Sequence, residues 1–401
     1  MNARSFFAVA AVVCFLLCWS ALAQEVRPTL PGGKLRTYYI AADEVEWDYT
    51  PDHRNHMSSN GDFDAYGKFF VEKGKDRVGT AYRKAIYREY TDATFSTLKK
   101  RPPEMQYLGM TGPMLHAEVG DTIRIIFKNN ATQPYSMHPH GVSYKKDSEG
   151  APYPGMSMAE TGLVPPSQLH TYIWNVPERA GPGANDPSSI VWLYHSHNYE
   201  PKDVNAGLAG PIVVTRRGMA RPDGTPKDVD REFACLFMLI DENQSPYLDH
   251  NINTYAGDPK SINKLEAVPA DPDGNAHLVL GKGFAIVNHK SAINGYMYGN
   301  GPMMTMRVGE HVRWYLLTVG DGFNFHTPHW HGNVVTMDKQ RIDILPLSPA
   351  TFVTVDMVPD NPGIWMFHCH VSEHMTSGMM THYQVLEAKN PARTTASAAS
   401  N

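Results

Sequence analysis

The chain has little cysteine, and this limits how its fold can be held together. Only four cysteines occur in 401 residues, and Cys14 and Cys18 lie among the first 23. Of the other two, Cys235 lies inside the apolar run 233–240, where a cysteine is most simply a small buried hydrophobe. If Cys369 binds a metal, no internal disulfide remains. The fold must then depend on its cores and on contacts between subunits.

The chain also lacks a strong charge of either sign and a long helical period. It has 41 acidic and 36 basic residues, a formal net charge of -5, and no basic run that would indicate nucleic acid or an anionic membrane as a partner. Short runs rich in β-branched and aromatic residues recur between Gly, Pro and Asn, which predicts an all-β sandwich. The clearest runs are 122–128, 172–176, 190–195, 233–240, 311–318 and 352–358. Residues 76–98 leave room for a short helix.

One long apolar run is present, at residues 6–23. It follows Arg4 and ends in small residues before Gln24, as a secretory signal peptide does. A retained membrane anchor is the alternative, because the run is nearly long enough to span a bilayer. We expect residues 1–23 to be cleaved, leaving a secreted or periplasmic chain with no membrane segment. The length suffices for two domains with full cores.

The densest chemistry lies near the C-terminus, where Cys369 stands between His368 and His370, followed by His374 and Met379. A cysteine, two histidines and a weak axial methionine form a blue-copper electron-transfer site. Alternate side chains of an extended segment point to opposite faces. Cys369 would then face one way and both neighbouring histidines the other, towards a second metal site. A buried strand whose histidines are only hydrogen-bonded is the alternative.

Three further histidine clusters argue against that alternative. They are His138-Pro-His140, His195-Ser-His197 and His326-Thr-Pro-His329-Trp-His331. One H-x-H motif is weak, but these three followed by the H-C-H motif resemble the multicopper oxidases. Segments 38–42, 46–51, 76–79, 90–95 and 241–243 further resemble ceruloplasmin and hephaestin. The resemblance covers most of the mature chain, as one pair of domains where ceruloplasmin has three.

The resemblance implies four coppers per functional unit. The type 1 copper, which takes single electrons from the substrate, would be held by His326, Cys369, His374 and Met379. The type 2 copper of a trinuclear cluster would be held by His138 and His329. The type 3 pair would be held by His140, His195, His197, His331, His368 and His370. Because Cys369 is covalently next to two cluster ligands, an electron taken at its sulfur has a short bonded route to the cluster.

The chain repeats itself, since residues 118–124 reappear as 307–313 and residues 191–197 as 364–370. Each half therefore predicts one Greek-key sandwich, which the resemblance makes a cupredoxin domain. Ser196 stands in the first half where the second half has Cys369, so blue copper is expected only in the second half.

These halves give the expected domains. Residues 24–218 would form the first, and residues 230–388 the second. A polar linker would join them, and residues 389–401 would form a disordered tail.

The resemblance implies an oxidase that couples one-electron oxidation of phenols, aromatic amines or low-valent metal ions to four-electron reduction of dioxygen to water. A dedicated ferroxidase is the alternative within that class. Glu373 matches a carboxylate of the oxidising ceruloplasmin domain, but Ile286 and Ser291 stand where a glutamate and a histidine are expected. A copper nitrite reductase and a non-enzymatic copper protein are weaker alternatives, because all eight trinuclear positions are occupied.

The same resemblance implies an assembly. In ceruloplasmin six domains form a ring, and the cluster lies between the first and the last. A chain with one domain pair rebuilds that ring only as a head-to-tail homotrimer, with a cluster at every junction. A monomer whose two domains clasp the cluster directly is the alternative.

Overall fold

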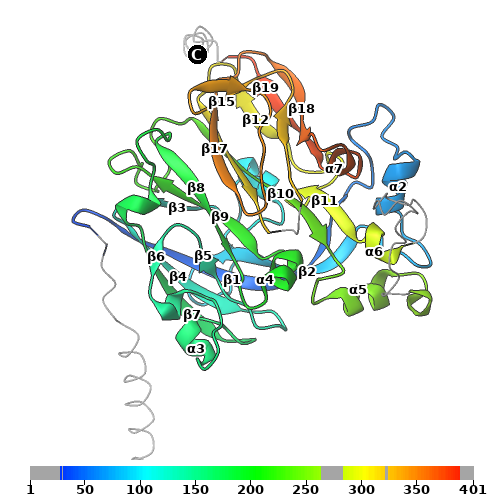
Figure 1. Ribbon diagram of the computed structural model, residues 1–401, viewed down its shortest axis with the longest axis horizontal. Coiled ribbons are helices and arrows are strands. Elements are labelled where there is room, and N and C mark those ends of the chain that lie inside the picture. Colours follow the sequence, from blue (N-terminus) through cyan, green and yellow to red (C-terminus); the bar gives the residue numbers. More distant parts are fainter. Residues whose placement is uncertain (1–27, 29, 263–282, 321–323, 389–401) are drawn as a thin grey trace, which may run out of the picture.

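The computed structural model describes residues 28, 30–262, 283–320 and 324–388 (Figure 1). The expected signal peptide and C-terminal tail lie outside these residues. A strand lies in each of the six predicted runs, so the all-β prediction is confirmed. Within the described residues, no helix has the length and apolar character needed to cross a membrane.

The first half of the chain forms a sandwich of two sheets. Its strands are β1 (Leu35–Asp48), β2 (Ala81–Tyr90), β3 (Leu115–Glu118), β4 (Thr122–Asn129), β5 (His138–Pro139), β6 (Ser143–Tyr144), β7 (Leu169–Asn175), β8 (Ser189–His195) and β9 (Ala209–Thr215). One sheet has the order β2-β1-β4-β7-β6 and the other β3-β9-β8-β5. The part of the chain where we allowed a helix contains β2 instead. Its helix, α2 (Ala65–Val71), comes earlier.

The second half repeats this arrangement. Its strands are β10 (Arg231–Asp241), β11 (His289–Ile293), β12 (Met304–Arg307), β13 (Val312–Thr318), β14 (Pro328–Trp330), β15 (Val335–Met337), β16 (Gln340–Ile342), β17 (Phe352–Met357), β18 (Gly363–Cys369) and β19 (Met380–Leu386). The sheets have the orders β11-β10-β13-β17-β15-β16 and β12-β19-β18-β14. The parallel pair β1–β4 corresponds to β10–β13, and β3–β9 to β12–β19. The predicted repeat is therefore one of complete Greek-key sandwiches.

Short helices connect the strands. The remaining ones are α3 (Met158–Thr161), α4 (Glu200–Ala206), α5 (Leu248–Tyr255), α6 (Phe284–Val287) and α7 (Ser372–Thr376). Helices α4 and α7 occupy corresponding positions, each between the last two long strands of its half. In Figure 1, α2, α6 and α7 lie at the same end of the second sandwich.

The two halves share part of their cores. One cluster of buried side chains belongs to the first half, apart from Tyr247. The other fills the second sandwich and continues into the first through residues such as Tyr49, Tyr82 and Leu193. Cys235 is fully buried in that shared cluster, and burial raises the pKa of its thiol. Its predicted role as a small buried hydrophobe is consistent with this position.

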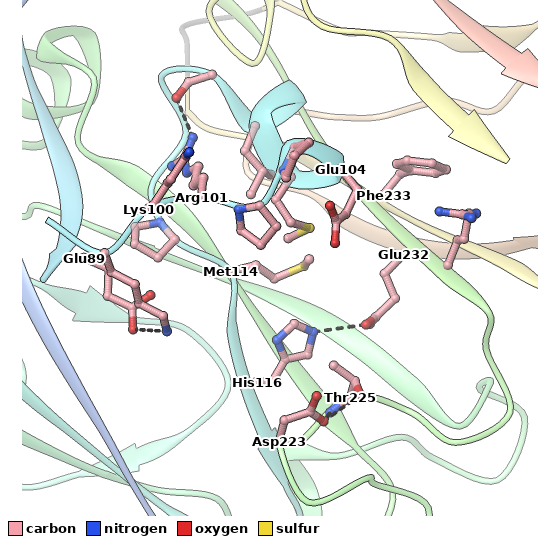
Figure 2. Close-up of a pocket in the computed structure, with 18 of the residues that line it drawn as sticks. Glu89, Lys100, Arg101, Glu104, Met114, His116, Asp223, Thr225, Glu232 and Phe233 are labelled. Carbon is pink, nitrogen blue, oxygen red and sulfur yellow. Dashed lines mark hydrogen bonds and ion pairs between the residues drawn. The ribbon is translucent and has the colours of Figure 1, made fainter. Parts of the chain in front are cut away.

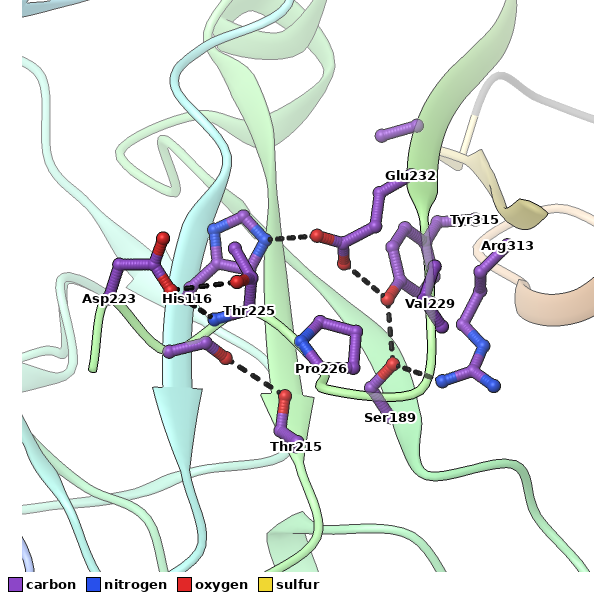
Figure 3. A network of polar contacts seen from close by, with 12 residues as sticks. His116, Ser189, Thr215, Asp223, Thr225, Pro226, Val229, Glu232, Arg313 and Tyr315 are labelled. Carbon is purple, nitrogen blue, oxygen red and sulfur yellow. Dashed lines mark hydrogen bonds and ion pairs between the residues drawn. The ribbon is translucent and has the colours of Figure 1, made fainter. Parts of the chain in front are cut away.

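A buried polar network also crosses between the halves (Figure 3). His116 of β3 lies 3.2 Å from a Glu232 oxygen of β10. Glu232 accepts a hydrogen bond from Tyr315 at 2.7 Å, and the Tyr315 hydroxyl lies 2.7 Å from Ser189 of β8. Arg313 donates to the same serine at 2.8 Å. These contacts tie two strands of each half together, so the relative position of the sandwiches is fixed by polar as well as apolar contacts.

A second interface contact is a fully buried ion pair between Lys84 of β2 and Glu242, which follows β10. Burial lowers the pKa of Lys84, and the neighbouring carboxylate opposes that shift. The ammonium also donates to the Asn205 carbonyl at 2.6 Å. Removing one partner of such a pair leaves the other charge buried and uncompensated.

We expect Lys84→Met to lower the free energy of unfolding by about 3–5 kcal/mol. Lys99→Met, which removes the exposed partner of Glu89, is the matched control and should cost less than about 1 kcal/mol. Urea unfolding followed by tryptophan fluorescence measures both. Equal small losses would show that the buried pair is not needed at the interface.

Candidate metal centres

Three predicted type 1 ligands converge at one end of the second sandwich. Cys369 ends β18, His374 lies in α7, and His326 lies shortly before β14; the Cys369 and His326 side chains are fully buried and His374 nearly so. The Cys369 sulfur is 4.0 Å from His326 Nδ1 and 3.7 Å from His374 Nδ1. Both imidazoles therefore present the same nitrogen to one thiol.

The surroundings of the Cys369 thiol favour its ionised form. Burial raises the pKa of Cys369, but hydrogen bonds from His326, His374 and the backbone amides of Thr327 and Val371 outweigh burial and lower the pKa to about 6. A thiolate is the form that binds metal. The sequence placed these residues together, and the structure adds the backbone donors.

The fourth predicted ligand, Met379, is fully buried beside them. Its carbonyl accepts a hydrogen bond from the Cys369 amide at 3.0 Å, and its amide donates to the His374 carbonyl at 2.8 Å. The segment from α7 to β19 is thereby held against both other ligands. A buried thioether next to a Cys-His-His set is the donor arrangement of blue copper.

A first histidine half-site lies where β5 meets β8. The Nε2 atoms of His140 and His195 are 3.2 Å apart. The rings of His138 and His197 lie against each other with centroids 5.0 Å apart. Imidazole nitrogens lie about 2.0–2.1 Å from a bound first-row ion such as zinc, so one ion can contact both Nε2 atoms.

A second half-site with the same geometry lies where β14 meets β18. The Nε2 atoms of His331 and His368 are 3.1 Å apart. The rings of His329 and His370 are in contact, with centroids 5.3 Å apart. The two half-sites thus contain all eight predicted trinuclear ligands, four in each half of the chain.

Backbone carbonyls select the tautomer in both half-sites. Nδ1 of His138 donates to the Glu149 carbonyl at 2.7 Å, and Nδ1 of His329 donates to the Asp343 carbonyl at 2.8 Å. His195 and His368 each donate Nδ1–H to the carbonyl of the following residue, at 3.0 and 2.8 Å. Because a carbonyl only accepts, the proton sits on Nδ1 and the Nε2 lone pair is free for a metal.

Burial keeps these imidazoles neutral. It lowers the pKa of His140 to about 4, with neighbouring histidines adding to the shift. Burial likewise lowers the pKa values of His138, His195, His331 and His368. Neutral imidazoles with free lone pairs are metal ligands at neutral pH.

The two H-x-H motifs that end at His140 and His331 each need the glycine that follows them, a signal that the sequence also contains. Gly141 and Gly332 have φ of +76° and +72°. A Cβ at either position would lie 2.3 or 2.4 Å from the ring of Trp192 or Trp365. The tryptophan stacks on bare backbone and holds the turn that aims the preceding histidine. The repeated H-x-H-G and Trp pattern was visible in both halves.

The first half has a polar network where the second half has its thiolate site. Ser196 replaces Cys369 and donates to Asp203 at 2.7 Å. Its oxygen accepts from the Ser136 amide at 3.0 Å, just as the Cys369 sulfur accepts from Thr327. Hydroxyls and a carboxylate fill the position, and Pro201 and Ala206 stand where the second half has His374 and Met379.

The expected iron-site partners are absent at their aligned positions. Ile286 is a buried apolar side chain, and Ser291 is buried with its hydroxyl 2.6 Å from that of Ser377. His289 lies 3.4 Å from Asp241 instead. Glu373 is exposed in α7, next to His374. One of the expected carboxylates therefore reaches the surface beside the thiolate site.

A large cavity is separate from these ligands (Figure 2). It has a volume of about 1210 Å³ and lies between the halves, lined by Arg101, Met114, His116, Glu232 and Phe233 among others. None of the twelve predicted metal ligands lines it. Figure 2 shows His116 joined to Glu232 at its edge, so the polar groups there already pair with each other. The predicted metal ligands therefore form sites of their own, apart from this cavity.

The donor sets fit copper. A buried Cys-His-His set with a methionine beside it suits copper better than a hard cation such as Mg²⁺ or Ca²⁺, which takes oxygen ligands. The half-sites offer imidazole nitrogens, which suit copper and leave positions for other ligands.

Comparison with known proteins agrees with this donor chemistry. Family models described as multicopper oxidase match residues 106–218 and 271–389. Human ferroxidase HEPHL1 is 42% identical over 366 residues, which are 90% of this chain and 30% of that protein. Human ceruloplasmin is 39% identical over 360 residues, 88% of this chain and 31% of that protein. The chain thus spans about a third of the length of these curated relatives.

The fold agrees as well. A crystal structure of a multicopper oxidase superposes with a TM-score of 0.53 at 20% identity, over 90% of this chain and 93% of that chain. At that identity the match concerns the fold alone. Together with the two family models and the relatives above, it establishes the lineage: the chain belongs to the multicopper oxidase family.

Proposed function

We propose that the protein is a multicopper oxidase with laccase-like activity, which couples one-electron oxidation of small reductants to four-electron reduction of dioxygen to water. The observation that carries this proposal is the position of Cys369. Its sulfur lies in a buried Cys-His-His set, while its two sequence neighbours, His368 and His370, belong to a histidine half-site. An electron-accepting site and an oxygen-reducing site are thereby joined by covalent bonds.

The proposed ligand roles follow the two kinds of site. Type 1 copper would be held by His326, Cys369, His374 and Met379. Type 2 copper would be held by His138 and His329, and the type 3 pair by the other six histidines of the half-sites. When bound, these four coppers supply one-electron redox chemistry and a place for dioxygen to be reduced.

The side chains and backbone of the protein orient the ligands, exclude water and admit the reductant. His368 donates Nδ1–H to the Cys369 carbonyl at 2.8 Å, which fixes the imidazole directly beside the cysteine backbone. The buried walls around Cys369 keep water from its sulfur. His374 is buried in α7 and Glu373, the residue before it, is exposed, so this helix offers an approach for a reductant from solvent. Four electrons delivered one at a time along this route match the demand of one dioxygen.

The domain roles are also proposals. Residues 24–218 would form a domain that contributes only trinuclear ligands, and residues 230–388 one that adds the type 1 site. In support, the sandwiches share their topology, and Ser196 with Asp203 fills the first-half position of the thiolate. The mature chain would be secreted or periplasmic after loss of residues 1–23, an inference from their sequence pattern.

The functional unit is proposed to be a homotrimer, because the two half-sites are not combined within one chain. Among the eight described histidines, every ring contact joins members of the same half. What the second half presents to His140 is Phe352 of β17, with ring centroids 5.1 Å apart. A complete cluster then requires the second half-site of another copy.

Apolar side chains beside both half-sites support this head-to-tail contact. Near the first, Tyr199 is 57% exposed, and Tyr153 donates to Glu149, whose carbonyl holds His138. Near the second, Val334 is 50% exposed and lines a groove with His329 and His331. Exposed apolar residues grouped around a polar site indicate a protein interface. A heterologous contact that closes after three copies repeats the cluster at each junction.

The choice between a broad oxidase and a dedicated ferroxidase depends on Glu373. We expect Glu373→Ala to reduce kcat/KM for Fe(II) by about tenfold or more while changing phenol oxidation little, because a carboxylate favours a hard cation and not a neutral phenol. Steady-state rates with both reductants measure this.

Glu104→Ala, which removes an exposed glutamate lining the separate cavity, is the matched control and should leave both rates unchanged. Equal losses with Fe(II) and phenol in the Glu373 variant would remove the iron role from this residue.

A further inference from the structure

A second set of soft donors lies on the outer face of the β18–β19 sheet, apart from the twelve ligands described above. His382 of β19 pairs directly across from Met366 of β18. On the same face the next pair towards the metal centres is Met380 with His368. Side chains of directly paired residues lie side by side, with Cβ atoms about 4.5–5.5 Å apart. The donors thus begin next to a trinuclear ligand and continue outward.

The loop after β1 covers this face and adds two more donors, His56 and Met57. The His56 amide donates to the Tyr298 carbonyl at 3.0 Å, and the Asn300 side chain donates to the Arg54 carbonyl at 2.9 Å. The loop is therefore pinned by its backbone over the turn at Gly299.

The donors converge on the space that Gly299 leaves open. A Cβ at this glycine would lie 2.8 Å from the Met57 sulfur and 3.6 Å from Nδ1 of His382. It would also lie 3.1 Å from Cβ of His56. With φ of +75°, this position favours glycine in any case. A thioether and an imidazole nitrogen face the same small volume.

A carboxylate fixes the tautomer of His56. Nε2 of His56 lies 2.9 Å from a carboxylate oxygen of Asp52. Because an ionised carboxylate only accepts, Nε2 carries the proton and the Nδ1 lone pair is free. A carboxylate behind a histidine is the usual outer partner of a metal-bound imidazole. His382 is half-buried and has no hydrogen-bond partner in the described part of the chain.

We infer that His56, Met57 and His382 form a binding site for Cu(I), with Met366 beside it. Two imidazoles and a thioether are soft donors that select Cu(I) over hard cations such as Mg²⁺ or Ca²⁺. One Asp52 oxygen is taken by His56, and the atoms nearest a Cβ at Gly299 belong to Met57, His56 and His382, not to a carboxylate. A calcium or magnesium ion therefore finds no suitable ligand set here.

The site is joined to the thiolate centre through the backbone. The Gly299 amide donates to the Met380 carbonyl at 2.9 Å, and the Tyr298 amide donates to the Gly378 carbonyl at 2.8 Å. These two hydrogen bonds flank Met379. Bound Cu(I) would lose one electron to become Cu(II), and the electron would enter the oxidase through the site of Met379. This last step rests on the proposed function, whereas Cu(I) binding does not.

The test measures Cu(I) binding directly. Copper-loaded protein is titrated without oxygen against a coloured Cu(I) chelator, bicinchoninate. We expect one Cu(I) per chain beyond the catalytic coppers, and its affinity should fall by about tenfold or more in Met57→Leu and in His382→Gln. His53→Gln, in the same loop but with a 71% exposed side chain, is the control and should bind as the parent does.

Kinetics then separate the two parts of the inference. With oxygen present, both variants should raise KM for Cu(I) while leaving phenol oxidation and the blue absorption unchanged. Unchanged Cu(I) affinity in Met57→Leu and His382→Gln overturns the site, even in an active oxidase. Weaker Cu(I) binding in a protein that oxidises no reductant supports the site and contradicts the proposed function. Melting temperatures of the variants show that a loss of affinity is not a loss of fold.

Discussion

Cys369→Ser is expected to abolish the blue absorption and all oxidase turnover, because it removes the sole thiolate of the motif. The Cys369 sulfur faces Nδ1 of both His326 and His374, and no other sulfur ligand of that kind lies near them in the described chain. A serine hydroxyl cannot give the thiolate-to-copper absorption and binds copper weakly. Visible absorption spectra and oxygen consumption with a phenol measure the result.

The same variant should still bind metal at the histidine half-sites. Their imidazole pairs depend on backbone carbonyls, and the Cys369 carbonyl that holds His368 remains after the substitution. Copper content should therefore fall by about one ion of four. Cys235→Ser is the matched control, since this second buried cysteine contacts Met304 and no histidine. Retained blue colour in Cys369→Ser would refute the type 1 assignment.

Much of the fold was predictable because short apolar runs and an internal repeat indicate its strands. Runs such as 122–128 and 233–240 alternate or cluster apolar residues in the way that strands do, and they became β4 and β10. The repeat of 191–197 in 364–370 predicted corresponding strands, and β8 and β18 occupy corresponding places in their sheets. Residues 76–98 were ambiguous because their charged residues also suit a helix. Pairing of β2 with β1 decides it, a contact that no local window contains.

The residue types of the candidate metal sites could be predicted from the sequence, but the contacts between distant segments could not. Spacing within the H-x-H and H-C-H motifs predicted donors that the structure brings together, since such motifs place donors on neighbouring residues. What spacing cannot give is contact between distant segments. Gly299, His56 and His382 are far apart in the sequence, and only the turn that pins the loop over β19 brings them together. Spacing likewise cannot give the distance between the two half-sites, because they also lie on segments far apart in the sequence.

Mixing two inactive variants is expected to restore activity if the cluster lies between subunits. His140→Ala breaks only the first half-site, because its Nε2 contact is with His195. His331→Ala breaks only the second, where it faces His368. When both are expressed in one cell, some junctions join the intact first half of one subunit to the intact second half of another. In a random one-to-one mixture about a quarter of the junctions are complete.

The control for this experiment uses two lesions in the same half-site. Mixing His140→Ala with His195→Ala leaves every first half-site broken, so no junction recovers in a trimer. In a monomer that closes its own cluster, neither mixture recovers, because each chain carries one broken half. Oxygen consumption of the purified mixtures and their sedimentation give the answer. Activity in the first mixture alone, in a species of three chains, is the result that the proposed assembly requires. An active copper-loaded monomer would contradict it, because Phe352 and not a histidine of the second half faces His140.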